Sequence, residues 1–355
     1  MEPISYFIER RRLPIATIYE IAKLLHTSPA TVSRALSGTG YVRRELREQV
    51  IQLAKEMDYQ PNTLARSLTK KESNTIGFIL TDIMNPLLTA FAQNIERNLT
   101  DEGYAMILMT TEHNPLKEAR ALDVLRSKQV DGIIMYSVSD YNQEKINTIR
   151  QSECPIVLLT EEITTCDVVS IDNQLGAYKA VSYLAGLGHQ RIAFINGGGI
   201  LGSKRKLTGY LNALDEYGCP YDPDLITIPK EINYEHGFYA AERFLSQAHP
   251  PTAIFASSDY LALGAMSWCL KQGLAIPRDV SLVGFDDIEA VKYSPVPLTS
   301  VNYQIERIAQ SALERLFELI ARGDKRLDSI EAIQTFIEPD LVIRQSAASA
   351  INPEL

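Results

Sequence analysis

Residues 17–37 combine apolar positions at helical spacing with small hydroxyl groups and one arginine. Ser28 followed by Pro29 is typical of a helix start, because serine caps the first turn and proline fits its first position. The segment therefore predicts two short helices joined by a tight turn. The second helix would expose small or hydrogen-bonding groups and Arg34, a cation that can reach phosphate or guanine. Such a pair can place one helix in the major groove of DNA, although an ordinary surface hairpin of helices gives the same pattern.

A third helix is expected at about residues 44–57, where apolar residues recur on one face. Pro61 then interrupts the chain, and Asn62 can cap a further short helix that ends near Leu68. A helix this short is marginal alone in water, so it needs a partner helix and a surface to lie on. Residues 69–74 are polar and are expected to form a linker.

Basic charge gathers at the beginning of the chain. The first 71 residues hold 12 Lys and Arg against 7 Asp and Glu, a net charge of +5, whereas the whole chain carries −9. The rest of the chain therefore carries −14. A basic head on an acidic body indicates that nucleic acid binds at one end only.

Composition argues against several other classes of protein. No stretch approaches the roughly 18 consecutive apolar residues of a membrane span, and the first residues lack the apolar core of a signal peptide. We therefore expect a cytoplasmic protein without membrane contact. The four cysteines show no paired spacing and no histidine partners, so neither a metal nor a cofactor is expected.

From residue 74 onward, short apolar runs alternate with amphipathic helical stretches. Continuous apolar strands indicate parallel sheets buried on both faces, and strand–helix alternation is typical of doubly wound α/β folds. About ten such units exceed one compact sheet of the usual size, so two similar lobes in tandem are expected. The predicted strands are 76–80, 104–109, 132–136, 156–159, 168–171, 192–195, 225–228, 253–256 and 280–285. The predicted helices are 88–102, 117–128, 175–186, 206–217, 236–248 and 261–272.

Short sequence words recur along the chain in a distinctive order. They are Ala30-Thr-Val-Ser-Arg34, Tyr59, Pro61-Asn62, Leu64-Ala-Arg-Ser-Leu68, Thr75-Ile-Gly77, Asp131-Gly-Ile-Ile134, Ile171-Asp-Asn173, Gly188-His189, Ser258-Asp259, Gly284-Phe-Asp-Asp287 and Pro297-Leu-Thr299. In this order and spacing they resemble the lactose/galactose-repressor (LacI/GalR) family of bacterial transcriptional regulators. The resemblance runs from about Ala16 to Arg344.

The resemblance implies an N-terminal all-α helix-turn-helix head and an α/β core of two doubly wound parallel-sheet lobes, similar to periplasmic binding proteins. The implied parts are an arm (1–15), the head (16–60), a hinge helix and linker (61–73), the core (74–345) and a tail (346–355). Lobe one would span about 74–171 and 304–332, and lobe two about 172–302 and 334–345. The turn of the head holds His26 where the family usually has glycine. Because histidine tolerates a left-handed backbone better than branched residues do, we expect a strained but intact turn.

The implied function is that of a DNA-binding transcriptional regulator, expected to be a repressor and not an enzyme. Its partner would be double-stranded operator DNA, bound at a palindrome by a homodimer or a higher oligomer. Pro29, Ala30 and Arg34 would face base edges, and Leu68 of each hinge helix would wedge between base steps in the minor groove. The predicted DNA-contacting residues are Thr17, Tyr19, Ser28, Pro29, Ala30, Thr31, Ser33, Arg34, Tyr41, Asn62, Ala65, Arg66 and Leu68.

Ligands of open α/β sheets lie beyond the carboxyl ends of the strands. Polar residues at those positions are therefore candidates for ligand contact, although strand ends are also polar where they meet solvent or cap the next helix. Asp259 and Asp287 suit that second role, since each precedes a helical run. The candidates are Thr81, Asp82, Ser137, Ser139, Thr160, Glu161, Asn196, Ser257, Ser258, Asp259, Asp286 and Asp287.

The resemblance adds positions where this chain departs from the family. Lys206 replaces the ligand-binding arginine, which changes a flat bidentate fork into a point charge. Ser258 replaces an asparagine, and both Leu87-Leu88 and Ile232 replace aromatic residues. The predicted effector-binding residues are Thr81, Ser139, Lys206, Ile232, Ser258, Asp286 and Tyr303.

The implied effector is a small molecule, expected to be a carbohydrate or a related metabolite, that moves the two lobes and thereby the order of the hinge helices. Two other classes remain as alternatives. A solute-binding protein outside the cytoplasm shares the two lobes but would lack the head and carry a signal peptide. An enzyme would need Asn196-Gly-Gly-Gly199 as a phosphate loop, but that run lacks the lysine and the serine or threonine of a nucleotide loop.

Overall fold

The computed structural model describes residues 17–38, 40–59, 72–136, 142–151, 154–159, 166–197, 202–228, 232–322 and 332–350. The chain divides into two compact units, Met1–Ser73 and Asn74–Leu355, which we call the head and the core.

Three helices make up the described part of the head: α1 (Ile18–Leu24), α2 (Pro29–Ser37) and α3 (Arg44–Glu56). The predicted positions of all three helices are confirmed. Their apolar faces meet in one small core, in which Ile21, Val32 and Val50 are fully buried. Because helices this short are marginal alone in water, this shared core is what stabilises them.

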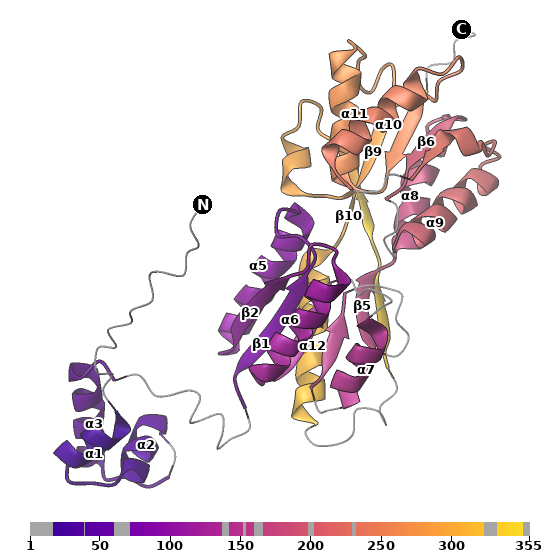
Figure 1. Cartoon of the computed structure of the whole chain (residues 1–355). Coiled ribbons are helices and arrows are strands. Elements are labelled where there is room, and N and C mark those ends of the chain that lie inside the picture. The colour runs from indigo at the N-terminus through magenta and orange to yellow at the C-terminus, as the bar shows by residue number, and fades with distance from the viewer. Residues whose placement is uncertain are drawn as a thin grey trace, which may run out of the picture. The chain divides into compact units, whose positions relative to one another are not determined.

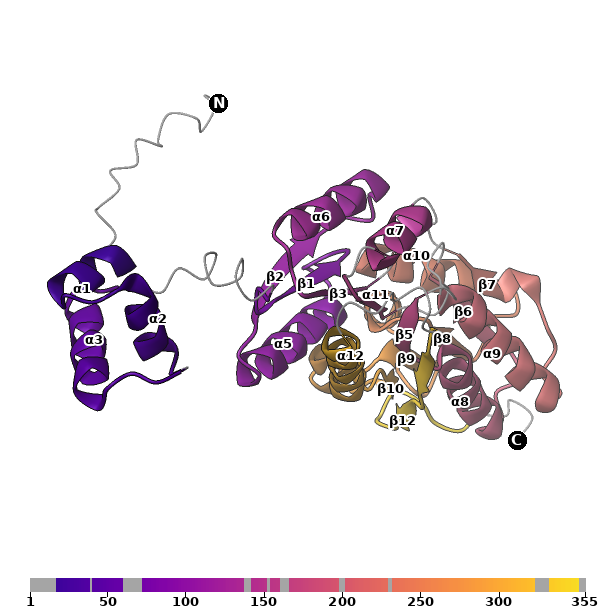
Figure 2. The ribbon, with the colours of Figure 1, turned by 90° about the horizontal axis from the view of Figure 1, so that it is seen from below.

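Lobe one of the core is built on a parallel sheet (Figure 1). Helices α5 (Pro86–Asp101) and α12 (Ile305–Ala321) cover one face, and α6 (Pro115–Ser127) and α7 (Gln143–Gln151) lie on the other (Figure 2). In order across the sheet, the strands are β11 (Gln334–Ile337), β5 (Asp167–Ile171), β4 (Ile156–Leu158), β3 (Gly132–Met135), β1 (Thr75–Leu80) and β2 (Ala105–Thr110).

Lobe two repeats this plan with one antiparallel edge strand, β12, which pairs with β10. Helix α8 (Asn173–Gly186) packs against α9 (Gly202–Glu216), and α10 (Tyr234–Leu245) packs against α11 (Asp259–Lys271). The short helices η3 (Pro223–Leu225) and η4 (Glu289–Lys292) complete it. In order, the strands are β12 (Asp340–Val342), β10 (Thr299–Asn302), β9 (Ser281–Asp286), β8 (Ala253–Ala256), β6 (Ile192–Ile195) and β7 (Ile226–Thr227).

Three crossovers join the lobes (Figure 1). They lie at Asp172 between β5 and α8, at residues 303–304 between β10 and α12, and at residues 338–339 between β11 and β12. Gln304 takes a left-handed backbone with φ 56°. The two doubly wound lobes are therefore confirmed, and each is assembled from separate stretches of the chain.

The structure differs from the expected boundaries in two places. Residues 334–345 were expected in lobe two, but β11 pairs with β5 at the edge of the lobe-one sheet. Residues 346–350, expected to begin a tail, are attached to lobe two. The Ser346 side chain is fully buried, and its hydroxyl donates to the Leu282 carbonyl at 2.6 Å. Backbone pairing of short segments decides both positions, and hydrophobic periodicity cannot report such pairing.

Several helices begin directly after a strand or turn with a polar side chain as their cap. Asn85 caps α5, Asp172 caps α8, Asn233 caps α10 and Ser258 caps α11, each by accepting a hydrogen bond from an N–H of the first turn. Part of the polar character at these strand ends therefore serves helix capping.

Candidate functional site

The first two helices of the head are fixed by side-chain caps. Thr17 and Glu20 form a capping box: the Thr17 N–H donates to Glu20 Oε2 at 2.7 Å, and the Glu20 N–H donates to Thr17 Oγ1 at 3.3 Å. Ser28 caps α2, because the Thr31 N–H donates to its Oγ at 3.1 Å. Predicted DNA-contacting residues therefore also hold the two helices in place.

Helix α2 divides into a buried face and an exposed face. Val32 and Ala35 enter the core of the head, whereas Ala30, Ser33 and Arg34 are exposed. The Arg34 guanidinium lies back along its own helix, where Nε donates to the Ala30 carbonyl at 3.2 Å. The exposed face is thus small and polar, with one cation that can extend from it.

Further predicted residues surround α2. Tyr19 on α1 is 71% exposed, and Tyr41 in the connection to α3 is 89% exposed. Pro29 and Thr31, in the first turn of α2, are partly exposed. The predicted residues Asn62, Ala65, Arg66 and Leu68 lie outside the described residues, as does Ser139 of the core.

The tight turn between α1 and α2 takes the expected form. His26 has a left-handed backbone with φ 48°, so the expected strain is present and the turn is intact. The Thr27 N–H closes the end of α1 on the Ala22 carbonyl at 2.9 Å.

In lobe two, two carboxylates lie in a strained backbone at the end of β9: Asp286 ends the strand and Asp287 follows it. Asp286 has φ 108° and Asp287 has φ 55°, backbone angles that residues other than glycine rarely adopt. Such outliers persist only where the surrounding structure enforces them, and they cluster at binding sites and switches. The strain therefore makes this turn a candidate for function.

Lys206 on α9 brings a buried cation to the same place. Its Nζ donates to the Ser257 carbonyl at 2.9 Å and lies 3.6 Å from the centre of the Phe285 ring. Burial raises the pKa of Asp286 to about 7, although the positive charge of Lys206 acts to lower it. Burial therefore favours the protonated form of Asp286 more strongly than is usual for a carboxyl group.

Two other predicted effector residues, Ile232 and Tyr303, lie near Ser257 and Phe285. The Tyr303 ring lies 6.2 Å from Phe285 and 5.8 Å from Phe91, centre to centre. Half-buried Ile232 packs on Gly197, whose N–H donates to Ser257 Oγ at 2.6 Å. The fold thus gathers Lys206, Ile232, Asp286 and Tyr303 around Ser257 and Phe285.

Of the remaining two predicted residues, one caps a helix and the other belongs to lobe one. Ser258 caps α11, and Thr81 lies in lobe one, buried directly after β1. A cavity of about 1300 Å³ runs between the lobes and is lined by Asp286 and Asp287, by parts of α5, by Asn302 and by residues 304–307.

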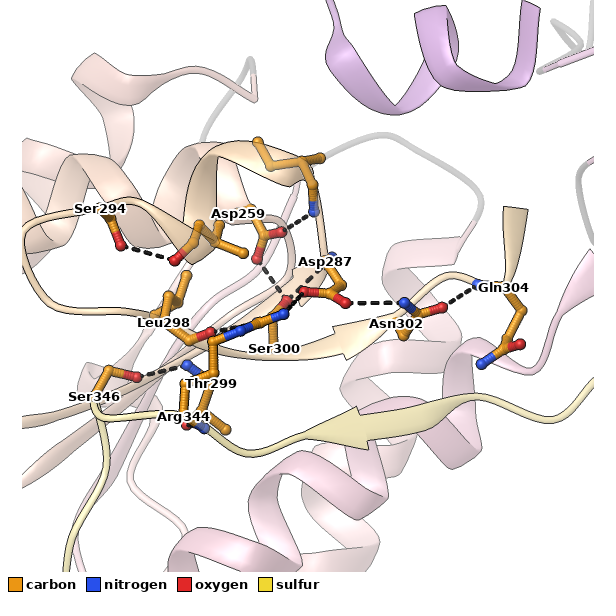
Figure 3. A network of polar contacts seen from close by, with 12 residues as sticks. Asp259, Asp287, Ser294, Leu298, Thr299, Ser300, Asn302, Gln304, Arg344 and Ser346 are labelled. Carbon is orange, nitrogen blue, oxygen red and sulfur yellow. Dashed lines mark hydrogen bonds and ion pairs between the residues drawn. The ribbon is translucent and has the colours of Figure 1, made fainter. Parts of the chain in front are cut away.

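Asp259 and Asp287 have structural partners (Figure 3). Asp259 accepts from the Ser300 hydroxyl at 2.6 Å and from the Ile288 N–H at 2.8 Å. Asp287 lies 2.6 Å from Arg344 Nη2 and accepts from Asn302 Nδ2 at 2.9 Å. The capping role expected for Asp259 is therefore wrong, since Ser258 caps the helix and Asp259 holds the turn after β9.

Sequence reasoning missed three residues of this network. Asn302 accepts from the Gln304 N–H at 2.8 Å, and the Gln304 side chain donates to Asp340 at 2.8 Å. Arg344 also donates to the Leu298 carbonyl at 2.7 Å. All three belong to or follow the short strands β10 and β12, which the apolar pattern did not reveal.

A second missed feature is an apolar surface on lobe two. Tyr234 and Tyr239 of α10 and Leu270 of α11 are exposed, and with Pro295 they line a pocket of about 530 Å³. Scattered single residues could not be recognised in the sequence as one surface. We call this the α10–α11 surface.

Comparison with known proteins places the chain. Residues 17–62 match the family described as bacterial regulatory proteins, lacI family, and residues 181–347 match a periplasmic binding protein-like domain. The HTH-type transcriptional regulator DegA of Bacillus subtilis is 33% identical over 94% of this chain and 98% of its own length. The chain belongs to the LacI family. As a LacI-family protein it is a transcriptional regulator and not an enzyme.

Other relatives and solved structures agree with the LacI-family assignment. The transcriptional repressor PurR of Histophilus somni is 32% identical, with 94% of this chain and 99% of PurR covered. The lac repressor dimer bound to operator and an anti-inducer has the same fold, with a TM-score of 0.84 at 23% identity over 94% of this chain and 99% of that one. A complex of the regulator CelR with cellobiose gives 0.70 at 26% identity over 94% and 100%. In the part of this chain that the structure describes, the helices are too short or too polar to cross a bilayer.

Proposed function

We propose that this LacI-family regulator is a repressor that binds a palindromic operator as a homodimer and responds to a small polyhydroxylated metabolite held between its lobes. The observation that carries the proposal is the exposed face of α2, which holds Ala30, Ser33 and Arg34 on a head followed in the same chain by a two-lobed core. Binding to chromosomal DNA would place the protein in the cytoplasm.

In this proposal α2 reads the major groove. Pro29, Ala30 and Arg34 face base edges, where arginine can bind guanine through two hydrogen bonds. Thr17, Tyr19, Ser28, Thr31, Ser33 and Tyr41 contact phosphates and sugars, and so fix register without reading sequence. The residues proposed for the minor groove are Asn62, Ala65, Arg66 and Leu68.

The α10–α11 surface is the proposed site of self-association. Monomeric proteins rarely leave a contiguous apolar surface uncovered, and aromatic residues are enriched where proteins meet. A two-fold axis through this surface would present two heads to a palindrome, as the symmetry of DNA requires. The lac repressor, whose fold this chain shares, binds its operator as a dimer.

The effector class follows from the polar atoms around Phe285. Asp286 and Lys206 offer an acceptor and a donor, and Asn196 is buried with no hydrogen-bond partner for its Oδ1 among the described residues. This mixture suits a carbohydrate, whose hydroxyl groups both donate and accept. CelR, with the same fold, binds cellobiose. Because aromatic residues are replaced at Leu87, Leu88 and Ile232, we do not propose a nucleobase.

Control by the effector would use the three crossovers. A ligand that binds between the lobes favours the lobe arrangement for which it has the higher affinity. The shift in the equilibrium between the two arrangements cannot exceed the difference between those affinities. Movement of paired lobes would alter the spacing of the hinge helices, which need each other to stay folded. The effector thereby changes the affinity for operator.

The first test is selection of genomic fragments by the full-length protein at fixed salt, followed by titration of the recovered fragment. Arg34→Ala should lower affinity for that fragment at least tenfold and relax its sequence preference. Lys55→Ala removes an exposed charge from the end of α3 and should leave the preference unchanged. Recovery of no preferred fragment, or a solely monomeric protein in sedimentation, would refute the proposal.

The second test is a thermal-shift screen of sugars, sugar phosphates and nucleosides, followed by titration of any ligand into wild-type and Asp286→Asn protein. The effector should bind Asp286→Asn more weakly, because the amide cannot replace the carboxylate as an acceptor on both oxygens. Equal affinity by calorimetry would remove Asp286 from the site.

A further inference from the structure

Among the described residues, a hydrogen bond joins the two lobes at a place away from the crossovers. The Tyr260 hydroxyl, at the beginning of α11 in lobe two, donates to the Met84 carbonyl in lobe one at 2.7 Å. Met84 belongs to the turn between β1 and α5. Other contacts between lobes, such as Lys179 Nζ to Glu338 Oε1 at 2.6 Å, lie at a crossover and would persist if the lobes rotated about it.

The acceptor is held in a fixed turn. The Met84 N–H donates to Asp82 Oδ1 at 2.8 Å, and the Thr89 hydroxyl donates back to the Ile83 carbonyl at 2.8 Å. Asn85 caps the helix that follows. Because both sides of the turn are anchored, the direction of the Met84 carbonyl is set by lobe one itself.

The donor is held equally firmly. The Tyr260 and Tyr234 rings are tilted against each other with centres 4.5 Å apart. Helices α10 and α11 approach so closely that a Cβ at Gly264 would lie 2.0 Å from the Tyr234 carbonyl oxygen. Burial raises the pKa of Tyr260 to about 12, so the hydroxyl keeps its proton at physiological pH and remains a donor.

Both ends of the bond lie next to predicted effector residues. Tyr260 is two residues after Ser258, and Met84 is three residues after Thr81. The bond therefore spans the opening between the ends of β8 and β1, on rigid arms from each lobe. A rotation that parts these two ends by even 1 Å would break it, since hydrogen bonds weaken steeply beyond about 3.2 Å.

We propose that Tyr260 and the Met84 carbonyl form a latch that sets the balance between two lobe arrangements, and hence the operator affinity of the effector-free protein. The proposal rests on the function proposed above, in which lobe arrangement controls DNA binding. A neutral hydrogen bond contributes enough to shift such a balance about two- to tenfold. The latch acts by holding the two lobes in one arrangement, and neither group is required to contact DNA or the effector.

The test compares full-length wild-type protein with Tyr260→Phe, which removes only the hydroxyl. Tyr221→Phe is the control, because Tyr221 is 59% exposed on lobe two. Hydrogen exchange should become at least threefold faster in Tyr260→Phe at the Asp82–Asn85 turn and at the three crossovers. A merely local loosening of α11 would not reach the crossovers, so unchanged exchange there would overturn the proposal.

The second measurement is affinity for the fragment recovered by selection with wild-type protein. Tyr260→Phe should change this affinity at least threefold, while Tyr221→Phe leaves it unchanged. If wild-type protein selects a fragment and Tyr260→Phe binds it equally well, the latch is refuted and the proposed function stands. If wild-type protein selects nothing, the proposed function fails, and the exchange measurement still decides whether the bond holds the lobes.

Discussion

Lobe one and lobe two share a strand order but bury charged residues at opposite ends of their strands. In lobe one, Arg315 on α12 lies 2.6 Å from Asp167, the first residue of β5, and both are buried. In lobe two, Asp259, Asp286 and Asp287 lie where β8 and β9 end. Ligands bind at the carboxyl ends of parallel strands. In lobe one the buried charges therefore lie away from that end, whereas in lobe two they lie at the end where ligands of such sheets bind.

The largest effect should come from lobe one. Asp167→Ala would leave the Arg315 guanidinium buried without its main partner and lower the free energy of unfolding by about 3–5 kcal/mol. Urea unfolding of the full chain measures this. Glu318→Gln removes the exposed partner of the same arginine and should cost less than about 1 kcal/mol. Similar losses in both variants would contradict the assigned role of the Asp167–Arg315 pair.

The next effect concerns helix packing in lobe two. Gly264→Ala should cost at least about 1–3 kcal/mol, because the added methyl group meets the Tyr234 backbone and the helices must separate. Gly186→Ala is the matched control, since the nearest atom to its added Cβ lies 4.0 Å away. That variant should be neutral or gain up to about 1 kcal/mol, because alanine favours helix. If Gly264→Ala lost no more stability than Gly186→Ala, helices α10 and α11 would not be in close contact.

Asp286 should give lobe two a pH dependence. Burial raises its pKa to about 7 in the folded protein, so the protonated form favours folding. The contribution is complete below the unfolded value of about 3.9 and is lost as pH rises through 7. Asp286→Asn should flatten the fall in thermal midpoint between about pH 4 and 7. Since burial also raises the pKa of Asp259, some slope will persist. Identical profiles for wild type and variant would exclude Asp286 as the titrating group.

His189 should give a smaller dependence of opposite sign. Its ring is within hydrogen-bond distance of Thr252 Oγ1 at 2.8 Å and the Ala348 carbonyl at 3.0 Å, and burial lowers its pKa. Neutral histidine therefore favours folding above pH 6.5, and this contribution is lost as pH falls, by at most about 1.4 kcal/mol per pH unit. His189→Gln should remove that acid-side loss. A variant that loses stability below pH 6.5 as steeply as wild type would disprove the assignment.

The elements that the sequence predicted correctly are those whose structure is determined by neighbouring residues in the chain. Ser28 and Pro29 start α2 because capping acts within one turn, and His26 occupies the left-handed turn for the same local reason. Strands such as β6 and β8 were placed correctly because they are buried on both faces, which makes their residues continuously apolar.

The parts that were missed depend on pairing between distant segments. Strands β10, β11 and β12 hold three or four residues each with mixed polar character, so only their partners define them. Asn302 meets Asp287 because β10 pairs with β9, and Arg344 meets it because the third crossover returns the chain to lobe two. The Tyr260–Met84 contact joins residues 176 positions apart, which no local pattern encodes.

The three crossovers also decide when each part of the protein can be completed during synthesis. The helices of the head end by Glu56, so a ribosome releases everything that unit needs early. Lobe one waits for β11 at Gln334–Ile337, and lobe two waits for β12 and for Ser346. Both sheets of the core are thus completed only by residues 334–346, long after the nascent head has emerged.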